Sequence, residues 1–284
     1  MESQPTYLII GAGVFGVSTA YHLIKKYPNT HIGLIDRTRY PCTLAASWDW
    51  NKVIRADYEI LKNYEKLGVE VDEEMVSIER CKKMYSSFYD DTDFSGAEEV
   101  FVNRDSAWAE ATNALTAYND AAIEAGLKYT AADIDVLTFG TDGGGTRFLT
   151  KGGENITAHR IILGTGAITA KLIADSAPNR SELQVHGRLV VGAVVTGLVD
   201  LDPKNGQHYT ERPVTVHSVL PIRGELIPIT SRLSDKDPYT VKSCRDDAYK
   251  NTVKHKASGQ GFSSPPGEAG QAQKQPDEGP QKTT

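Results

Sequence analysis

The stretch Tyr7–Arg37, YLIIGAGVFGVSTAYHLIKKYPNTHIGLIDR, decides the fold. It opens with a short apolar run, turns through GAGVFG at residues 11–16, and continues in a helical pattern that Pro28 ends. A second apolar run, residues 32–35, ends in Asp36, twenty residues after Gly16. This order of strand, glycine turn, helix, strand and acid is typical of a dinucleotide-binding βαβ unit.

Each glycine of this turn has a physical role. Gly11 permits a tight turn, Gly13 lets the backbone approach a pyrophosphate, and Gly16 lets the helix and strand pack closely. The helix N-terminus offers N–H groups to the phosphates, and the Asp36 carboxylate can accept hydrogen bonds from ribose hydroxyls. A lone GxGxxG motif is a weak signal. Because all its flanking elements are present, the sequence favours a dinucleotide site over a glycine turn of chance composition.

Bulk composition excludes several classes of protein. A chain of 284 residues could form one large domain or two ordinary ones. Its net charge of −6, without a basic stripe, argues against a nucleic-acid partner. No apolar run is long enough to span a membrane, and we expect residues 1–5 not to be a secretory signal. Three distant cysteines indicate a reduced, cytoplasmic protein without a metal site, and the C-terminal KTT is not a peroxisomal signal.

A second informative segment follows Asp36. Small residues at 45–47 would let a loop approach a phosphate, and Ser47 could cap the next turn or donate to the pyrophosphate. Lys52 and Arg55 are three residues apart and would share one face of a helical turn. Two tryptophans, a tyrosine and these two cations favour a pocket wall, with a solvated basic pair as the alternative.

The first 58 residues resemble the flavoprotein amine oxidases of the sarcosine oxidase and fructosyl amino acid oxidase group, especially its fungal members. The resemblance lies in GAGVFG, the acid–arginine pair at 36–37, the Ala-Ser ahead of a lysine, and KVIRADY at 52–58. It implies FAD as the cofactor. The residues that it places near FAD are Gly11, Gly13, Val14, Phe15, Gly16, Asp36, Arg37, Ser47, Asn51, Lys52, Ile134, Gly166 and Ala167.

The resemblance also implies a reaction. Lys52 would lie near the flavin, Arg55 would face the substrate carboxylate, and Lys242 would assist the activation of dioxygen, with a surface lysine as the alternative for Lys242. The implied substrate is a secondary amine: sarcosine or another N-methyl amino acid, a fructosyl amino acid, saccharopine or pipecolate. Dioxygen would be reduced to hydrogen peroxide, and we expect a monomer. Two alternatives stay open, a NAD(P)-dependent dehydrogenase and a truncated, catalytically silent flavoprotein-like chain.

The chain also departs from the family pattern. Relatives insert a helix and strands after the position of Tyr58, and they continue beyond the end of the resemblance into a part that carries the cysteine tethering the flavin. Cys42, Cys81 and Cys244 do not match that cysteine's context. We therefore expect FAD to bind without a covalent link.

The expected fold class is α/β, with a discontinuous Rossmann-like FAD/NAD(P)-binding domain and a β-rich α+β substrate domain. The first comprises residues 5–58 and 105–178, and the second residues 59–104 and 179–258. Residues 259–284 are rich in Gly, Pro, Gln and Lys, which predicts a disordered tail. Further expected helices are 60–67, 73–84 and 106–126, and expected strands include 184–195, 214–219 and 225–229.

Overall fold

The computed structural model describes residues 7–49, 51–54, 66, 68, 72–85, 88–140, 146–209, 213–217, 224–229, 239–245 and 248–265. The chain forms two compact units, each assembled from separate segments. The first unit comprises residues 1–49, 111–193 and 249–284, and the second comprises 50–110 and 194–248. The boundaries expected from the sequence, at 58, 104 and 178, differ from these. The expected α/β class is confirmed.

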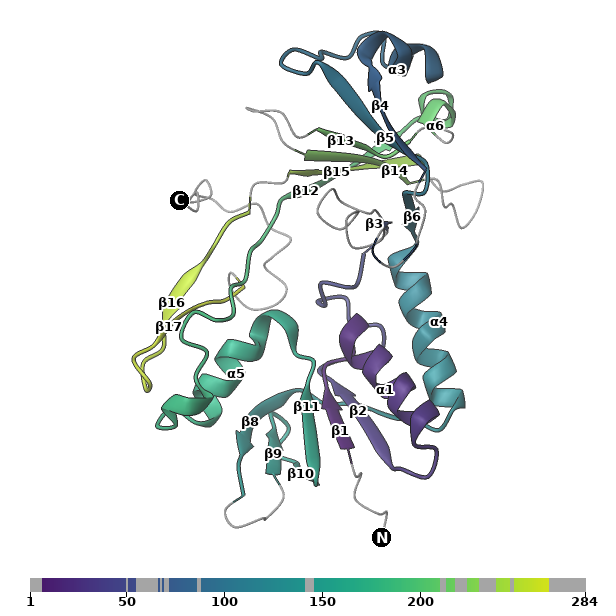
Figure 1. Ribbon diagram of the computed structural model, residues 1–284. Coiled ribbons are helices and arrows are strands. Elements are labelled where there is room, and N and C mark those ends of the chain that lie inside the picture. The colour runs from purple at the N-terminus through teal and green to yellow at the C-terminus, as the bar shows by residue number, and fades with distance from the viewer. Residues whose placement is uncertain are drawn as a thin grey trace. The chain divides into compact units, whose positions relative to one another are not determined.

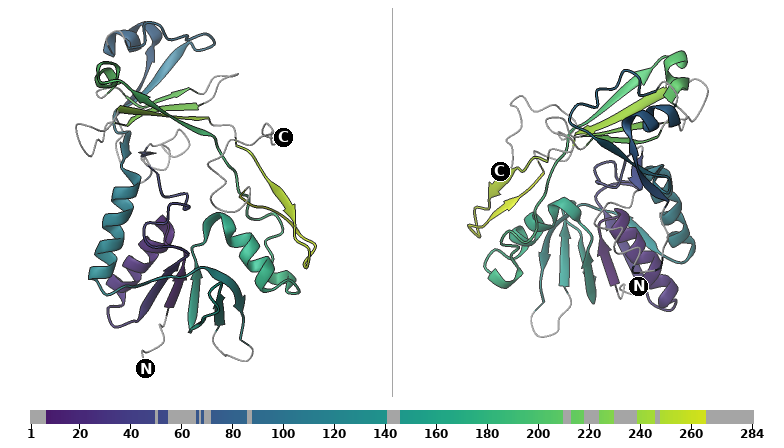
Figure 2. Two further views of the ribbon diagram at one scale, coloured as in Figure 1. Left: turned by 180° about the vertical axis from the view of Figure 1, so that it is seen from behind. Right: turned by 45° about the horizontal axis from the view of Figure 1, so that its top comes forward.

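The first unit is built on a parallel sheet (Figures 1 and 2). Its strand order is β11 (Arg160–Leu163), β1 (Tyr7–Ile10), β2 (Ile32–Asp36) and β7 (Lys128–Ala131). Helices α1 (Val14–Lys26) and α4 (Ala111–Glu124) cover one face. Side chains alternate along each strand, so Ile9 and Leu34 pack against these helices while Leu8 and Ile10 point to the other face.

The other face of the sheet packs against a small antiparallel sheet and a helix. The antiparallel strands are β8 (Ile134–Thr138), β9 (Thr146–Thr150) and β10 (Asn155–Ala158), and the helix is α5 (Thr169–Ser176). Short 3₁₀ turns, η1 (Gly166–Ile168) and η2 (Ser181–Leu183), flank α5. Phe148 is fully buried in this core, and Ser176 Oγ joins α5 to β8 by accepting from Leu137 N at 2.9 Å. The parallel sheet is thus covered on both faces, as parallel sheets require.

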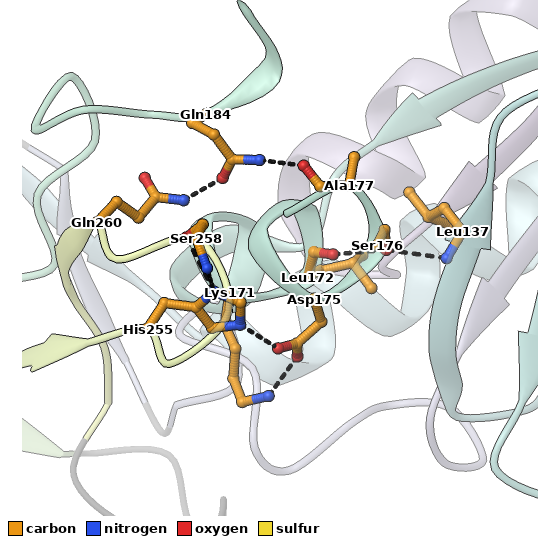
Figure 3. Close-up of polar contacts among 10 residues, drawn as sticks. All are labelled: Leu137, Lys171, Leu172, Asp175, Ser176, Ala177, Gln184, His255, Ser258 and Gln260. Carbon is orange, nitrogen blue, oxygen red and sulfur yellow. Dashed lines mark hydrogen bonds and ion pairs between the residues drawn. The ribbon is translucent and has the colours of Figure 1, made fainter. Parts of the chain in front are cut away.

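A hairpin of β16 (Thr252–Lys254) and β17 (Gly261–Ser263) packs on α5 (Figure 3). Ser258 N–H donates to His255 Nδ1 at 3.1 Å, so the ring hydrogen lies on Nε2, which donates to Asp175 Oδ1 at 3.0 Å. Phe262 is buried against Ala170 and other small side chains. The prediction of a tail from residue 259 is therefore wrong for residues 259–265, because Phe262 reaches a core contributed by α5. The rest of the predicted tail lies outside the described residues.

We expect Phe262→Ala to destabilise the first unit by about 3 kcal/mol or more, because truncating a buried aromatic side chain leaves a cavity. Chemical denaturation measures the loss. Deleting residues 266–284, which contain no large apolar side chain, is the matched control and should leave the unfolding midpoint unchanged. Equal stability of the Phe262→Ala and wild-type chains would show that the hairpin does not contribute to the core.

The second unit contains an antiparallel sheet with the strand order β12 (Thr196–Leu201), β15 (Tyr239–Arg245), β14 (Gly224–Ile229) and β13 (Thr215–His217). It also contains two strand pairs and two helices: β3 (Lys52–Ile54) with β6 (Ala107–Ala109), β4 (Glu73–Ser77) with β5 (Glu99–Asn103), α3 (Ile78–Met84) and α6 (Pro203–Tyr209). Val76, Cys81, Tyr89 and Val102 form its core cluster. Tyr89 Oη lies 2.7 Å from Thr215 Oγ1, which ties this cluster to β13.

Three expected elements differ from the observed ones. The helix expected at 73–84 begins as strand β4, and α3 starts only after Ser77, whose side chain accepts from Arg80 N. The helix expected at 106–126 begins with β6, because Trp108 pairs with Val53 of β3. The strand expected at 184–195 does not form, since His186 and Gly187 have positive φ angles of 45° and 79°. Residues 60–67 lie outside the description, except Lys66.

The described residues include no helix with the length and apolar character needed to cross a bilayer. They also include no cluster of three or more His, Cys, Asp or Glu side chains suited to a metal ion.

Candidate functional site

The GAGVFG turn lies where the parallel strands of the first unit end. Gly11 N donates to Ile35 O and Gly164 N donates to Ile10 O, both at 2.7 Å. The turns after β1 and β11 therefore begin side by side at the same edge of the sheet. The φ angle of Gly11 is +102°, which side chains rarely adopt. The carboxyl ends of parallel strands are where open α/β sheets bind ligands.

Three glycines meet at this edge of the sheet, and we call Gly11, Gly16 and Gly164 the glycine junction. A Cβ on Gly11 would lie 2.3 Å from Gly164 O, and a Cβ on Gly16 would lie 1.8 Å from Gly11 O. A Cβ on Gly164 would lie 3.3 Å from Gly11 O and from Gly16 Cα. The junction therefore holds strand, turn and helix in backbone contact. Sequence reasoning did not include Gly164 in the site, although it stands in the small-residue run GTGA.

Gly13 differs from the glycines of the junction. Among the described residues, a Cβ on Gly13 would meet only the Ser47 hydroxyl oxygen within 4 Å, at 3.0 Å. Ser47 Oγ also accepts from Val14 N at 3.2 Å, at the start of α1. Val14 and Phe15 are 49% and 80% exposed. The first turn of α1 is therefore open at Gly13, with a serine hydroxyl beside it.

Asp36 lies at the end of β2 with its carboxylate directed at the glycine turn. Oδ2 accepts from Ala12 N at 2.7 Å and Oδ1 accepts from Arg37 N at 2.6 Å. A carboxylate has about four acceptor positions, so Asp36 can still accept further hydrogen bonds. Burial and the nearby Asp36 charge raise the pKa of Tyr129 above its ordinary value. Tyr129 therefore stays protonated and donates to Thr38 O at 2.7 Å, a contact that sequence reasoning missed.

The remaining expected residues of the first unit follow the neighbouring strands. Ile134 begins β8, three residues after Ala131, which pairs with Asp36 in the parallel sheet. Gly166 and Ala167 open η1 after β11. Gly166 has a φ angle of +53°, and a Cβ built on it would meet no atom of the described residues within 4 Å. The expected residues of the first unit thus lie at the carboxyl ends of strands of one parallel sheet, or in the segments that follow those ends.

Asn51, Lys52 and Lys242 belong to the second unit. Lys242 is only 4% exposed, and its Nζ donates to Asn51 O at 3.1 Å. The alternative of a surface lysine is therefore wrong. Asn51 is fully buried, and neither polar atom of its amide has a hydrogen-bond partner among the residues that the structure describes. Lys52 is exposed in strand β3, so the helical turn expected there is wrong, and Arg55 lies outside the described residues.

A buried amide without a partner is costly, which makes the Asn51 side chain a candidate for binding a ligand.

Comparison with known proteins shows what the N-terminal segment is similar to. Residues 6–70 match the FAD dependent oxidoreductase family, DAO. This segment carries the FAD-dependent oxidoreductase signature. A stretch of 68 residues is 43% identical to L-saccharopine oxidase of Schizosaccharomyces pombe, which amounts to 24% of this chain and 16% of that protein. The FAD-dependent oxidoreductase resemblance seen in GAGVFG is thereby confirmed.

Solved structures share the fold. Fructosamine oxidase (Amadoriase II) from Aspergillus fumigatus is similar with a TM-score of 0.69 at 21% identity, over 93% of this chain and 67% of that one. A modified fructosyl peptide oxidase from Aspergillus nidulans gives a TM-score of 0.73 at 16% identity, over 93% and 70%. A thermally stable fructosyl peptide oxidase mutant gives a TM-score of 0.70 at 18% identity, over 93% of this chain and 70% of that one.

Proposed function

We propose that the first unit binds FAD without a covalent link and that the protein oxidises the C–N bond of an amino-acid-derived secondary amine. The proposed substrate class comprises N-methyl amino acids such as sarcosine, fructosyl amino acids, saccharopine and pipecolate, with dioxygen as the acceptor. The observation that carries the proposal is the open face of Gly13, beside Ser47 and α1, in a segment 43% identical to a saccharopine oxidase.

The residues at this site fit a dinucleotide. The start of α1 presents N–H groups and the positive end of the helix dipole, which favour a pyrophosphate. Ser47 Oγ already accepts from Val14 N, so its own hydrogen is free to donate to a phosphate oxygen. The spare acceptor positions of Asp36 suit ribose hydroxyls. Arg37, Ile134, Gly166 and Ala167 are proposed to contact the cofactor as the resemblance implies.

The reaction removes two electrons and two protons from H–C–N–H, giving an imine that water hydrolyses to a carbonyl compound and an amine. Bound FAD would supply the acceptor for these electrons, which reduce dioxygen to hydrogen peroxide. Among the chain's own groups, Arg55 is proposed to hold the substrate carboxylate. The ammonium of Lys242 is proposed to stabilise negative charge that develops on dioxygen, with Lys52 and Asn51 beside the flavin.

Two other functions are weaker candidates. A NAD(P)-dependent dehydrogenase would share the glycine turn, but the match to FAD-dependent oxidoreductases extends to residue 70, beyond the dinucleotide motif. A catalytically silent nucleotide-binding chain is the second alternative, and activity measurements separate it from the enzyme. A cytoplasmic location stays a prediction from the cysteine content.

We expect the purified 284-residue chain to bind FAD, and to release it on acid denaturation because no cysteine is expected to tether it. Equilibrium dialysis with FAD and, in parallel, with NADH measures the preference. Flavin fluorescence in the supernatant after acid precipitation would show that FAD is not covalently attached. A preference for NADH would favour the dehydrogenase, and fluorescence that stays with the polypeptide on a denaturing gel would contradict non-covalent binding.

Peroxide formation tests the reaction with FAD-loaded protein. Sarcosine, fructosyl-valine, saccharopine and pipecolate are compared at saturating concentration, with an FAD-loaded sample without amine as the background. Turnover of one of these amines above background supports the proposed oxidase. Stoichiometric FAD without turnover of any of the four supports the silent alternative.

A further inference from the structure

Strand β12 forms an open edge in the second unit. It pairs with β15 along its whole length, from Thr196 opposite Cys244 to Leu201 opposite Tyr239, and no described strand pairs with its other side. The opposite edge of the same sheet, β13, has three residues where β12 has six. Long open edges present unpaired N–H and C=O groups to other chains, whereas short edges are a common protection.

The side chains of this edge are apolar and exposed. Val194, Val195, Leu198 and Val199 are 51%, 49%, 49% and 56% exposed. Neighbouring residues of a strand point to opposite faces, so Leu198 and Val199 are exposed on different faces of the sheet. Apolar side chains are thus exposed on both faces of the edge strand. A partner that covers them must lie alongside β12. We call residues 194–201 the β12 edge.

We propose that the occupant of the β12 edge is a second copy of this chain, paired antiparallel to it through its own β12. A two-fold axis at Leu198 sets each Leu198 opposite Leu198 of the second copy and each Gly197 opposite Val199. Asp200 then lies opposite Thr196, so no like charges face each other. An isologous contact of this kind closes after two chains.

Charge and composition argue against other occupants. Residues 266–284 contain no Val, Leu, Ile, Met or aromatic residue, so this chain's own C-terminal segment offers no apolar side chains for the edge. The β12 edge carries Asp200 and no cation, which disfavours nucleic acid and anionic membrane surfaces. A self-paired strand of six residues is small compared with a stable interface of about 1,200–2,000 Å², so the dimer should be weak.

Sedimentation velocity of the 284-residue chain, at concentrations from low to high micromolar, tests the proposal. We expect the average mass of the wild type to rise from that of one 31.0 kDa chain towards that of two. The Val199→Lys chain should stay monomeric throughout, because a lysine on an edge strand opposes pairing. Its melting temperature should stay close to that of the wild type, because Val199 is already half exposed.

Val253→Lys is the matched control, since Val253 is exposed on β16 of the other unit and should leave association unchanged. A wild type that remains monomeric at every concentration overturns the proposal. So does association that survives in folded Val199→Lys protein, which would place the contact elsewhere, or growth beyond two chains, which a two-fold contact does not permit.

Discussion

Replacing Gly16 with alanine is expected to lower the free energy of unfolding of the first unit by about 3 kcal/mol or more. The new Cβ would lie 1.8 Å from Gly11 O, which is main chain and cannot rotate away. Gly11 N is itself held by Ile35 O at 2.7 Å, so relief would require the turn to leave β2. Alanine favours a helix over glycine by about 1 kcal/mol, and the clash outweighs this gain.

Thermal unfolding followed by circular dichroism measures the effect, and a fall of roughly 10 °C corresponds to this loss in a chain of this size. Gly152→Ala is the matched control. Its Cβ would lie 3.6 Å from Thr150 Oγ1, an ordinary contact, so its melting temperature should equal that of the wild type. A Gly16→Ala protein as stable as this control would show that the backbone segments of the glycine junction are not in close contact.

Gly13→Ala is expected to weaken FAD binding by about 100-fold or more, equivalent to about 2.8 kcal/mol, while the apoprotein keeps its stability. Among the described residues, the added methyl group meets only Ser47 Oγ, a side-chain atom that can rotate at the cost of its hydrogen bond from Val14 N. In the proposed complex the same methyl group occupies the space through which the pyrophosphate approaches the backbone. FAD affinity from equilibrium dialysis and the unfolding midpoint of the apoprotein separate the two effects.

The double variant Gly13→Ala with Ser47→Ala distinguishes a phosphate clash from a local one. Ser47→Ala alone is the reference for the double variant. If the methyl group acts by displacing Ser47, Gly13→Ala should weaken FAD binding no further in the Ser47→Ala background. If it acts on the pyrophosphate, Gly13→Ala should cost as much affinity in that background as it does in the wild type. Wild-type affinity in the single variant would show that the nucleotide does not pass Gly13.

The local sequence was sufficient to predict the structure where neighbouring residues determine the backbone conformation. The turn at Gly11 needs a backbone angle that favours glycine, and α1 and β2 follow from the apolar spacing on either side of Pro28. Asp36 could be placed at the carboxyl end of β2 because the strand and the acid are adjacent. The α/β class and the FAD-dependent oxidoreductase resemblance both followed from this one stretch.

Errors arose where distant partners decide the local structure. Residues 73–77 have a sequence compatible with a helix but pair as β4 with β5, some 25 residues later. Phe262 stands in a segment of tail-like composition, yet it is buried by α5 and Val185. In both cases the free energy comes from contacts that no local window of sequence contains.

By itself, the sequence determined the order of strand, glycine turn, helix and acid, because backbone angles and side-chain periodicity are properties of neighbouring residues. Only the tertiary structure showed that Gly11 and Gly16 lie against backbone, whereas Gly13 lies beside the Ser47 side chain. It also buried Lys242 beside Asn51 O, 191 residues away in the chain. Burial and close approach depend on which distant segments pack together, so the three-dimensional fold decided the role of each glycine and lysine.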